Sequence, residues 1–286
     1  MKKNYKKIII LFLLFINCIG FSKVCSAKTT NTLTPNNTES NDKIKENKVF
    51  TVLTSNLAPF SFIDPKTNEP TGIDIDIMNE IAKELGFNKV DMKIVPFSDL
   101  FEKLNSDDST YVAASGIIIT DKRKELVNFT EPLYKQSEAI IVPKVSKINF
   151  IEDLKDAVVG AQKGSVYLDL AEKWKKEGKV KDIIVFDDIP ELLSAISLKK
   201  IDAGIMDSII GQYLLFKGNL YLKILQPYTP EYPGIVGIAV KKSDVTLLNA
   251  MNKKIDDMKK DKTIKKILAK YGLSEEYLAD DIKKSN

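Results

Sequence analysis

The sequence predicts an α/β protein whose folded part consists of two lobes. Short apolar runs alternate with helical patterns from Val49 to about Leu273, which is typical of βα units arranged around mainly parallel sheets. This stretch of about 225 residues is long for one compact α/β domain and comfortable for two. The segment before Val49 has a different composition and predicts no part of the folded core.

Residues 1–27 have the pattern of an export signal. Four lysines precede nine consecutive apolar residues, Ile8 to Ile16, and Cys25-Ser26-Ala27 supplies the small residues that a signal peptidase requires. A retained anchor helix is the alternative, but the apolar run is too short to span a bilayer and Lys23 counts against it. We expect cleavage after Ala27 and an extracytoplasmic location, at the cell surface or in the periplasm.

Both cysteines of the chain, Cys18 and Cys25, lie in this signal, so we expect no disulfide or thiol chemistry in the mature protein. Attachment of a lipid at Cys18 stays open, although Asn17 stands where a small residue usually precedes a lipidated cysteine.

Without the five lysines of the signal, the chain has 38 basic and 39 acidic residues. This balance favours neither a nucleic-acid partner nor a membrane-surface partner, and we expect a monomer.

Three further parts follow from composition and pattern. Residues 28–48 are rich in Thr, Asn and Lys and predict a flexible tether, because they cannot bury enough apolar surface to fold. We expect a first lobe of 49–142 plus 237–279, a second lobe of 143–236, and a short tail, 280–286. The chain would cross between the lobes near Val142–Val145 and return near Tyr232–Gly237, which makes a hinge of two segments.

The individual elements are expected from runs of apolar residues with period two or with helical spacing. Strands are predicted at Val49–Thr54, Val90–Val95, Tyr111–Ser115, Glu138–Val142, Val158–Ala161, Ile183–Phe186, Ala203–Met206 and Gly237–Val240. Helices are predicted at Ile77–Leu85, Phe97–Leu104, Ser165–Lys176, Ile189–Leu198, Ser208–Phe216, Val245–Lys260 and Lys262–Lys270.

The stretch from Gly72 to Leu85 changes periodicity within a few residues. Its first isoleucines alternate with Asp74 and Asp76, as at the end of a strand, and its later apolar residues recur every four positions, as in a helix. Either aspartate is a candidate cap for the helix, since a carboxylate accepts hydrogen bonds from first-turn amides. Gly86 is expected to end it.

Several classes of chemistry are excluded or disfavoured by residue type. The chain contains no histidine, which excludes Ser-His and Cys-His nucleophilic systems and histidine-based zinc sites. The pairs Asp74/Asp76 and Asp107/Asp108 lack the further oxygen ligands and the spacing of a calcium loop, so no metal and no cofactor are expected.

Arg123 is the only arginine in the chain. A guanidinium binds a carboxylate through two parallel hydrogen bonds, which an ammonium cannot do, although an ordinary surface arginine is the alternative. The turn Gly160 to Ser165 lacks the spacing of a phosphate-binding loop. Gly164 and Ser165 instead suit a turn from strand to helix whose first amides face a carboxylate, or simply a helix cap.

The segment Gly72 to Leu85 resembles the signature of the family 3 extracellular solute-binding proteins, which are receptors for polar amino acids in ABC importers. A second resemblance covers Ser115 to Arg123 and Val127 to Tyr134. The resemblance to that family covers about residues 49–273. The resemblance implies the type II periplasmic-binding-protein fold, with two α/β lobes around a ligand cleft.

The family pattern implies roles for individual residues. Gly116 and Arg123 match a glycine carbonyl that holds the ligand's ammonium and an arginine that holds its carboxylate. Ile118 departs from the pattern, which usually has Thr or Ser there, so one ammonium partner is missing, at a cost of about 1–3 kcal/mol for a standard α-amino acid if nothing replaces it.

Two aromatic positions and one carboxylate complete the expected site. Leu57 stands where the family often has an aromatic wall. Phe97 keeps the second aromatic, although it could belong to the core. Asp207, at the end of a strand, resembles the second-lobe carboxylate that pairs with the ammonium, with a cap on the helix at Ser208 as the alternative.

The sequence therefore predicts a binding protein and not an enzyme. It would capture an amino acid or a close analogue between Arg123 and Asp207 and deliver it to the membrane subunits of an ABC importer. A dehydratase on the same fold, acting on a prephenate-like substrate, is an alternative with Glu80, Asp99 or Glu131 as weak candidates for an acid or base. A sensor that binds without transport is the other.

Overall fold

The computed structural model of the chain describes residues 48–218 and 221–279. The expected signal (1–27), the expected tail (280–286) and the expected tether, apart from Lys48, lie outside the described residues. Within the described ranges, no helix combines the length and the apolar content that a membrane crossing requires.

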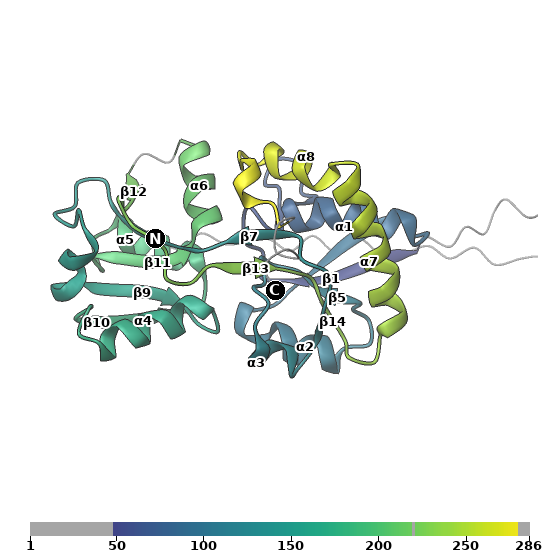
Figure 1. The fold of residues 1–286 in the computed structure, drawn as a ribbon, viewed down its shortest axis with the longest axis horizontal. Coiled ribbons are helices and arrows are strands. Elements are labelled where there is room, and N and C mark those ends of the chain that lie inside the picture. Colours follow the sequence, from purple (N-terminus) through teal and green to yellow (C-terminus); the bar gives the residue numbers. More distant parts are fainter. Residues whose placement is uncertain (1–47, 219–220, 280–286) are drawn as a thin grey trace, which may run out of the picture. The chain divides into compact units, whose positions relative to one another are not determined.

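The first lobe is built on a five-stranded sheet in the order β4-β1-β5-β14-β6 (Figure 1). β1 (Val49–Thr54) runs parallel to β4 (Lys89–Ile94) and β5 (Val112–Ala113), whereas β14 (Ala239–Val240) runs antiparallel to β5 and to β6 (Asn128–Phe129). The other elements of this lobe are α1 (Ile73–Glu84), α2 (Leu100–Ser106), α3 (Asp121–Lys124), α7 (Val245–Lys260), α8 (Thr263–Lys270), the 3-10 helices Phe97–Asp99 and Glu275–Tyr277, and a hairpin of β2 (Phe62–Ile63) and β3 (Pro70–Thr71).

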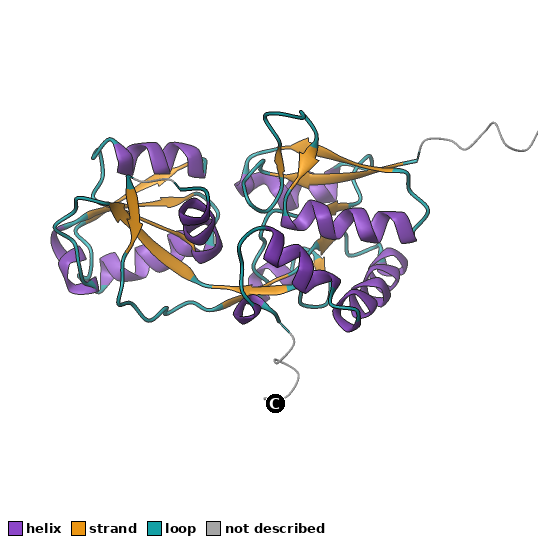
Figure 2. Ribbon diagram, turned by 90° about the horizontal axis from the view of Figure 1, so that it is seen from above, coloured by secondary structure: helices purple, strands orange, loops and turns teal. Residues whose placement is uncertain are grey.

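The second lobe has a sheet in the order β10-β9-β11-β8-β12. β9 (Val158–Gln162) runs parallel to β10 (Asp182–Phe186) and β11 (Ala203–Asp207), whereas β8 (Glu138–Pro143) runs antiparallel to β11 and to β12 (Leu222–Ile224). Its helices are α4 (Val166–Lys176), α5 (Ile189–Ser197), α6 (Ser208–Phe216) and the 3-10 helix Ile151–Asp156. Figure 2 shows helices flanking the strands of each lobe.

Helix α4 illustrates why these sequences form layers. Its buried residues are Val166, Tyr167, Leu170, Ala171 and Trp174, which recur at helical spacing and therefore share one face. That face packs against the sheet through β9, β10 and β11. The lysines of its last turn lie on the exposed side and complement the helix dipole.

Two strands connect the lobes. β7 (Tyr134–Gln136) and β13 (Gly234–Val236) pair antiparallel and lie side by side between the two sheets (Figure 1). β13 falls within the predicted return segment. The predicted first crossing at Val142–Val145 is wrong, because β8 already belongs to the second sheet; we place the boundary near Ser137 instead of at residue 143.

The predicted elements are present with two kinds of difference. β1, α6 and α7 have the predicted limits, and the remaining predicted helices and strands are present with shifted ends. The sheets are mixed and not mainly parallel, because β14, β8 and β12 pair antiparallel. The sequence pattern missed α3 and the short strands β2, β3, β6, β7, β12 and β13, which contain too few residues to show a period.

The stretch from Gly72 to Leu85 is helical almost from its start. α1 begins at Ile73, so the alternation of its first isoleucines does not mark a strand, and neither aspartate caps the helix. Asp74 is buried and turned towards the centre of the lobe, and Asp76 accepts hydrogen bonds from Lys270 at 2.7 Å and Tyr271 at 3.0 Å. Both predicted caps are therefore wrong, because tertiary partners take these carboxylates.

Gly72 makes this turn possible. Its φ of 126° lies in a region that favours glycine, and a Cβ here would lie 2.2 Å from the carbonyl oxygen of Phe60. The absence of a side chain thus allows the backbone of α1 to meet the loop after β1. Ile73 and Asp74 then donate backbone hydrogen bonds to Pro59 at 2.8 Å and Phe60 at 2.9 Å.

We predict that Gly72→Ala lowers the free energy of unfolding by on the order of 3 kcal/mol, because it adds a backbone clash to conformational strain. Gly86→Ala is the matched control: Gly86 has φ 79°, but a Cβ there would have no other atom within 4 Å, so only the strain of about 1 kcal/mol is expected. Urea unfolding of both variants measures the difference, and equal losses would contradict the role of the close contact.

Candidate functional site

The two sheets present the carboxyl ends of their parallel strands to one hollow. Leu57 follows β1, Phe97 follows β4, and Gly116 follows β5, while Ser165 follows β9 and Asp207 ends β11. Carboxyl ends of parallel strands meet at the same edge of a sheet, which is where α/β proteins commonly bind ligands. The topology therefore gathers side chains that are far apart in the sequence.

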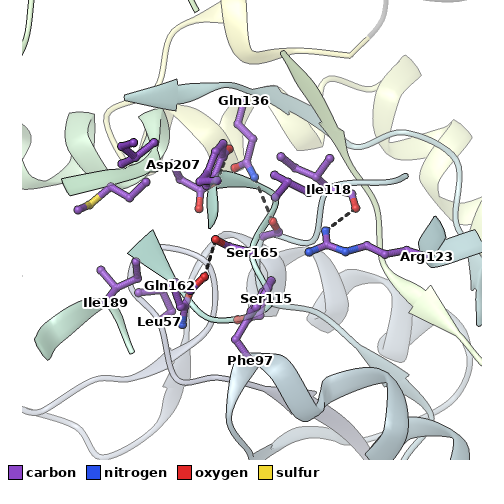
Figure 3. A pocket seen from close by; sticks show the side chains of 15 residues that line it. Leu57, Phe97, Ser115, Ile118, Arg123, Gln136, Gln162, Ser165, Ile189 and Asp207 are labelled. Carbon is purple, nitrogen blue, oxygen red and sulfur yellow. Dashed lines mark hydrogen bonds between the residues drawn. The ribbon is translucent and has the colours of Figure 1, made fainter. Parts of the chain in front are cut away.

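The hollow lies between the lobes (Figure 3). Its lining is mixed, with apolar side chains from both lobes and a small set of polar groups. The residues are Leu57, Phe97, Ser115, Gly116, Ile118, Arg123, Gln136, Gln162, Ser165, Val166, Tyr167, Ile189, Ile205, Met206 and Asp207.

Arg123 is buried at the edge of the hollow. It lies on α3, which Thr120 caps by accepting a hydrogen bond from the Arg123 amide. Its Nη1 donates to the carbonyl oxygen of Ile118 at 2.7 Å, and its Nη2 donates across the lobes to that of Gly164 at 3.2 Å. The rings of Phe97 and Phe101 lie 5.7 and 5.6 Å from the guanidinium carbon.

The charge of Arg123 has no carboxylate partner at ion-pair distance among the described residues. Burial lowers the pKa of its guanidinium, and the carboxylate of Asp207 acts in the opposite direction from farther away. Carbonyl groups and aromatic faces thus hold the cation without neutralising it. This arrangement leaves the guanidinium available for an anion.

Asp207 is the negative counterpart on the second lobe. Its Oδ1 accepts a hydrogen bond from the hydroxyl of Tyr167 at 3.0 Å, and it makes no capping hydrogen bond to α6, so the cap interpretation is wrong. Burial raises the pKa of this carboxyl to about 7, against the hydrogen bond from Tyr167 and the charge of Arg123. A nearby cation would favour its ionised form.

Gly116 forms the floor of the site on the first lobe. Its φ is 65°, and a Cβ would lie 2.7 Å from the ring of Phe60. The Gly116 amide donates to Asp74 Oδ2 at 2.8 Å, and the Tyr134 hydroxyl donates to Asp74 Oδ1 at 2.7 Å. Burial raises the pKa of Asp74 to about 6, while these two hydrogen bonds oppose the shift. Asp74 thereby fixes the turn that presents Gly116.

Ser165 caps the helix α4 beside the hollow. Its Oγ accepts from the Leu168 amide at 3.2 Å and donates to the carbonyl oxygen of Gln162 at 2.7 Å. The cap interpretation of Ser165 is therefore confirmed. The residue lines the hollow as well, so the positive end of α4 faces the same space.

The structure brings the predicted site residues together. Seven of them line the hollow: Leu57, Phe97, Gly116, Ile118, Arg123, Ser165 and Asp207. Gly164 is not among the lining residues and meets the site through its hydrogen bond with Arg123. Their role as ligand contacts stays a prediction. Ile118 is apolar and packs on Gly234, so it offers no side-chain acceptor.

Further residues line the hollow that were not predicted from the sequence, among them Gln136, Gln162 and Tyr167. Gln162 and Tyr167 flank the predicted turn at Gly164, and their nearness to it in the sequence was the available signal. Gln136 offered none, since it lines the hollow only because β7 pairs with β13. The weak dehydratase candidates Glu80, Asp99 and Glu131 do not line the hollow. Within the described residues, no cluster of acidic side chains could hold a metal ion.

Comparison with known proteins agrees with this architecture. The family model of the bacterial extracellular solute-binding proteins, family 3, matches residues 50–274. A probable histidine-binding protein of Neisseria gonorrhoeae is 31% identical over 231 residues, which cover 78% of this chain and 83% of that protein. The ABC transporter glutamine-binding protein GlnH of Bacillus subtilis is 26% identical, over 93% of this chain and 97% of that protein.

Solved structures share the fold. An ancestral arginine-binding protein bound to arginine matches with a TM-score of 0.69 and 34% identity, over 78% of this chain and 97% of that one. An ancestral amino-acid-binding protein, AncCDT-1, described as a precursor of cyclohexadienyl dehydratase, matches with a TM-score of 0.70 and 29% identity, over 80% and 98%. The expected two-lobe type II periplasmic-binding-protein fold is confirmed. Because the family model spans most of the chain, this protein belongs to the bacterial extracellular solute-binding proteins of family 3.

Proposed function

We propose that this protein captures a free amino acid with an uncharged side chain and delivers it to an ABC importer. The observation that carries the proposal is the pair of opposite charges, Arg123 and Asp207, which share one hollow without an ion pair between them. A zwitterion supplies a carboxylate for the first and an ammonium for the second. The two costs of desolvation are then offset at once.

The carboxylate end of the ligand would lie against Arg123. The guanidinium has a planar set of donors that matches a carboxylate, and in the described structure it donates to two carbonyl oxygens, which are weaker acceptors. Ser165 at the start of α4 brings the positive end of a helix dipole to the same space. Both features favour an anionic group at this end.

The side chain of the ligand would lie among neutral residues. Of the described residues that line the hollow, only Arg123 and Asp207 are charged, and the proposal assigns both to the ligand's main-chain groups. A cationic side chain would need a second carboxylate to offset its desolvation. Leu57, Phe97 and Ile118 instead favour apolar contacts, with the hydroxyl of Ser115 and the amide of Gln162 as neutral polar partners.

Capture would depend on movement of the lobes. Arg123 belongs to the first lobe and Asp207 to the second, so a ligand that contacts both binds better when the lobes are together. Contacts across the cleft already exist: Arg123 donates to Gly164, and the rings of Phe62 and Tyr213 are 6.5 Å apart. The paired strands β7 and β13 are the connection about which the lobes would move.

Export and delivery rest on the family and on the beginning of the sequence. The matched family is extracellular, and the relatives from Neisseria gonorrhoeae and Bacillus subtilis are named as amino-acid-binding proteins. The export signal predicted at 1–27 is consistent with an extracytoplasmic location. A monomer that closes on its ligand would be recognised by the importer's membrane subunits.

Turnover is the second candidate function. A carboxyl group with a pKa of about 7, such as Asp207, can act as a general acid or base at neutral pH, and AncCDT-1 is described as the precursor of a dehydratase. We favour binding because the charges of the hollow match a zwitterion. Incubation of the protein with prephenate distinguishes the two functions, because formation of a dehydrated product would favour an enzyme over a binding protein.

The proposal is tested by thermal unfolding in the presence of each of the twenty protein amino acids and L-cystine. A ligand at about a hundred times its dissociation constant adds about 2.7 kcal/mol to the free energy of unfolding. We expect the largest shift from an amino acid with an uncharged side chain. No shift with any of them would contradict amino-acid capture, and shifts with lysine and arginine alone would contradict the assigned ligand class.

We predict that Arg123→Met weakens binding of the amino acid identified in that screen by at least about a hundredfold, because it leaves the ligand carboxylate buried without a cation, at a cost of about 3 kcal/mol. Lys124→Met is the control, since Lys124 is exposed and forms an ion pair with the exposed Asp121. Isothermal titration calorimetry measures both, and full affinity in Arg123→Met would refute the assigned orientation.

We also predict that affinity rises with pH up to about 7. The ligand ammonium binds the ionised form of Asp207, whose pKa in the free protein is about 7, so below that pH binding must release a proton. Affinity at pH 6 should be about tenfold weaker than at pH 8. Asp207→Asn should bind weakly with no such dependence. A flat wild-type profile between pH 6 and 8 would count against this contact.

A further inference from the structure

The connecting strand β7 places one buried glutamine in the hollow. Gln136 is the last residue of β7, pairs with Gly234 of β13, and is 4% exposed. It lines the hollow, and Figure 3 shows its side chain between Asp207 and Ile118. The glutamine thus lies where the negative group of the second lobe meets the apolar residue that departs from the family pattern.

A hydrogen bond determines the orientation of the Gln136 side-chain amide. Its Nε2 donates to the carbonyl oxygen of Gly116 at 3.0 Å. A carbonyl oxygen only accepts, so the nitrogen must be on this side and the amide oxygen on the other. Oε1 is buried and has no hydrogen-bond partner among the described residues. Buried acceptors are rarely left unsatisfied, so this oxygen needs an explanation.

The surroundings of Gln136 suit a cation. The carboxylate of Asp207 is close enough that the Gln136 amide helps to lower the pKa of that carboxyl, against the larger effect of burial. The same amide nitrogen donates to the carbonyl oxygen of Gly116, so Asp207 and Gly116 both lie near the nitrogen end of the amide, beside the Oε1 that has no partner among the described residues. An ammonium has three N–H donors and no acceptor, so it requires several acceptors close together.

Ile118 explains why such an acceptor is needed. Its side chain packs against Gly234, where a Cβ would lie 2.7 Å from Ile118 Cδ1, and Gly234 is the pairing partner of Gln136. The apolar residue and the unpartnered oxygen are therefore neighbours across the same pair of strands. A hydroxyl at position 118 would have reached this region of the hollow, and isoleucine offers none.

We propose that Gln136 Oε1 accepts a hydrogen bond from the α-ammonium of the bound amino acid, beside the carboxylate of Asp207. Gln136 thereby provides the neutral acceptor that Ile118 lacks, from the connecting strand and not from the turn after β5. This inference rests on the proposed function. It makes Gln136 a determinant of specificity for ligands that carry an ammonium group.

The test compares each amino acid that binds the wild-type protein, among the twenty protein amino acids and L-cystine, with its des-amino carboxylic acid. Gln136→Met keeps the length of the side chain and removes the acceptor. We expect it to weaken binding of the amino acid about 10- to 100-fold, as for loss of a hydrogen bond to a charged group, and to change binding of the des-amino acid less than threefold. Calorimetry at pH 8 keeps Asp207 ionised.

Two further variants make the result decisive. Gln136→Asn keeps an amide but withdraws it by one carbon atom, so it should show the same selective loss even if Gln136→Met does not fold. Gln212→Met, which changes a glutamine of α6 outside the hollow, controls for the loss of a glutamine as such.

The outcomes separate this inference from the proposed function. An unchanged ratio of the two affinities in a folded Gln136 variant, or an equal loss for both ligands, would overturn the role of Oε1 while leaving amino-acid capture intact. Absence of binding by every amino acid to the wild-type protein would instead overturn the proposed function, and this inference with it.

Discussion

The site depends on two buried groups of opposite charge that lie in one hollow and do not pair with each other. Burial disfavours both charges: it lowers the pKa of Arg123 and raises that of Asp207 to about 7. Carbonyl oxygens and aromatic rings hold the cation, and one tyrosine hydroxyl holds the carboxyl. A direct ion pair would stabilise the empty protein and occupy the site. Because the two groups do not pair with each other, each can bind a ligand group of opposite charge.

The wall of the first lobe holds this arrangement in place. Gly72 lets α1 approach the loop after β1, and the second residue of that helix, Asp74, reaches the amide of Gly116 and the hydroxyl of Tyr134. Gly116 in turn offers its carbonyl to Gln136 on the connecting strand. The carboxylate of Asp74 is thus linked through two hydrogen bonds, by way of Gly116, to Gln136, the residue proposed to contact the ligand's ammonium.

How much could be predicted from sequence varied with the length of the element. The long helix α7 was predicted with its limits because its 16 residues repeat the same helical pattern. The connecting strands β7 and β13 have three residues each and gain their stability from pairing with each other, which no local pattern reports. Asp74 was wrongly predicted as a helix cap because its hydrogen-bond partners, Gly116 and Tyr134, are far from it in the sequence.

The fold class, the family and seven of the 15 residues that line the candidate site could be predicted from the sequence, because strand ends, glycine turns and a single arginine are local features. Only the tertiary structure decided where the lobes divide, what Asp74 and Asp207 contact, and which atom of the Gln136 amide is left without a partner among the described residues. These depend on pairing between residues far apart in the chain. The physical reason is that burial and hydrogen-bond partners are properties of the folded chain and not of a segment.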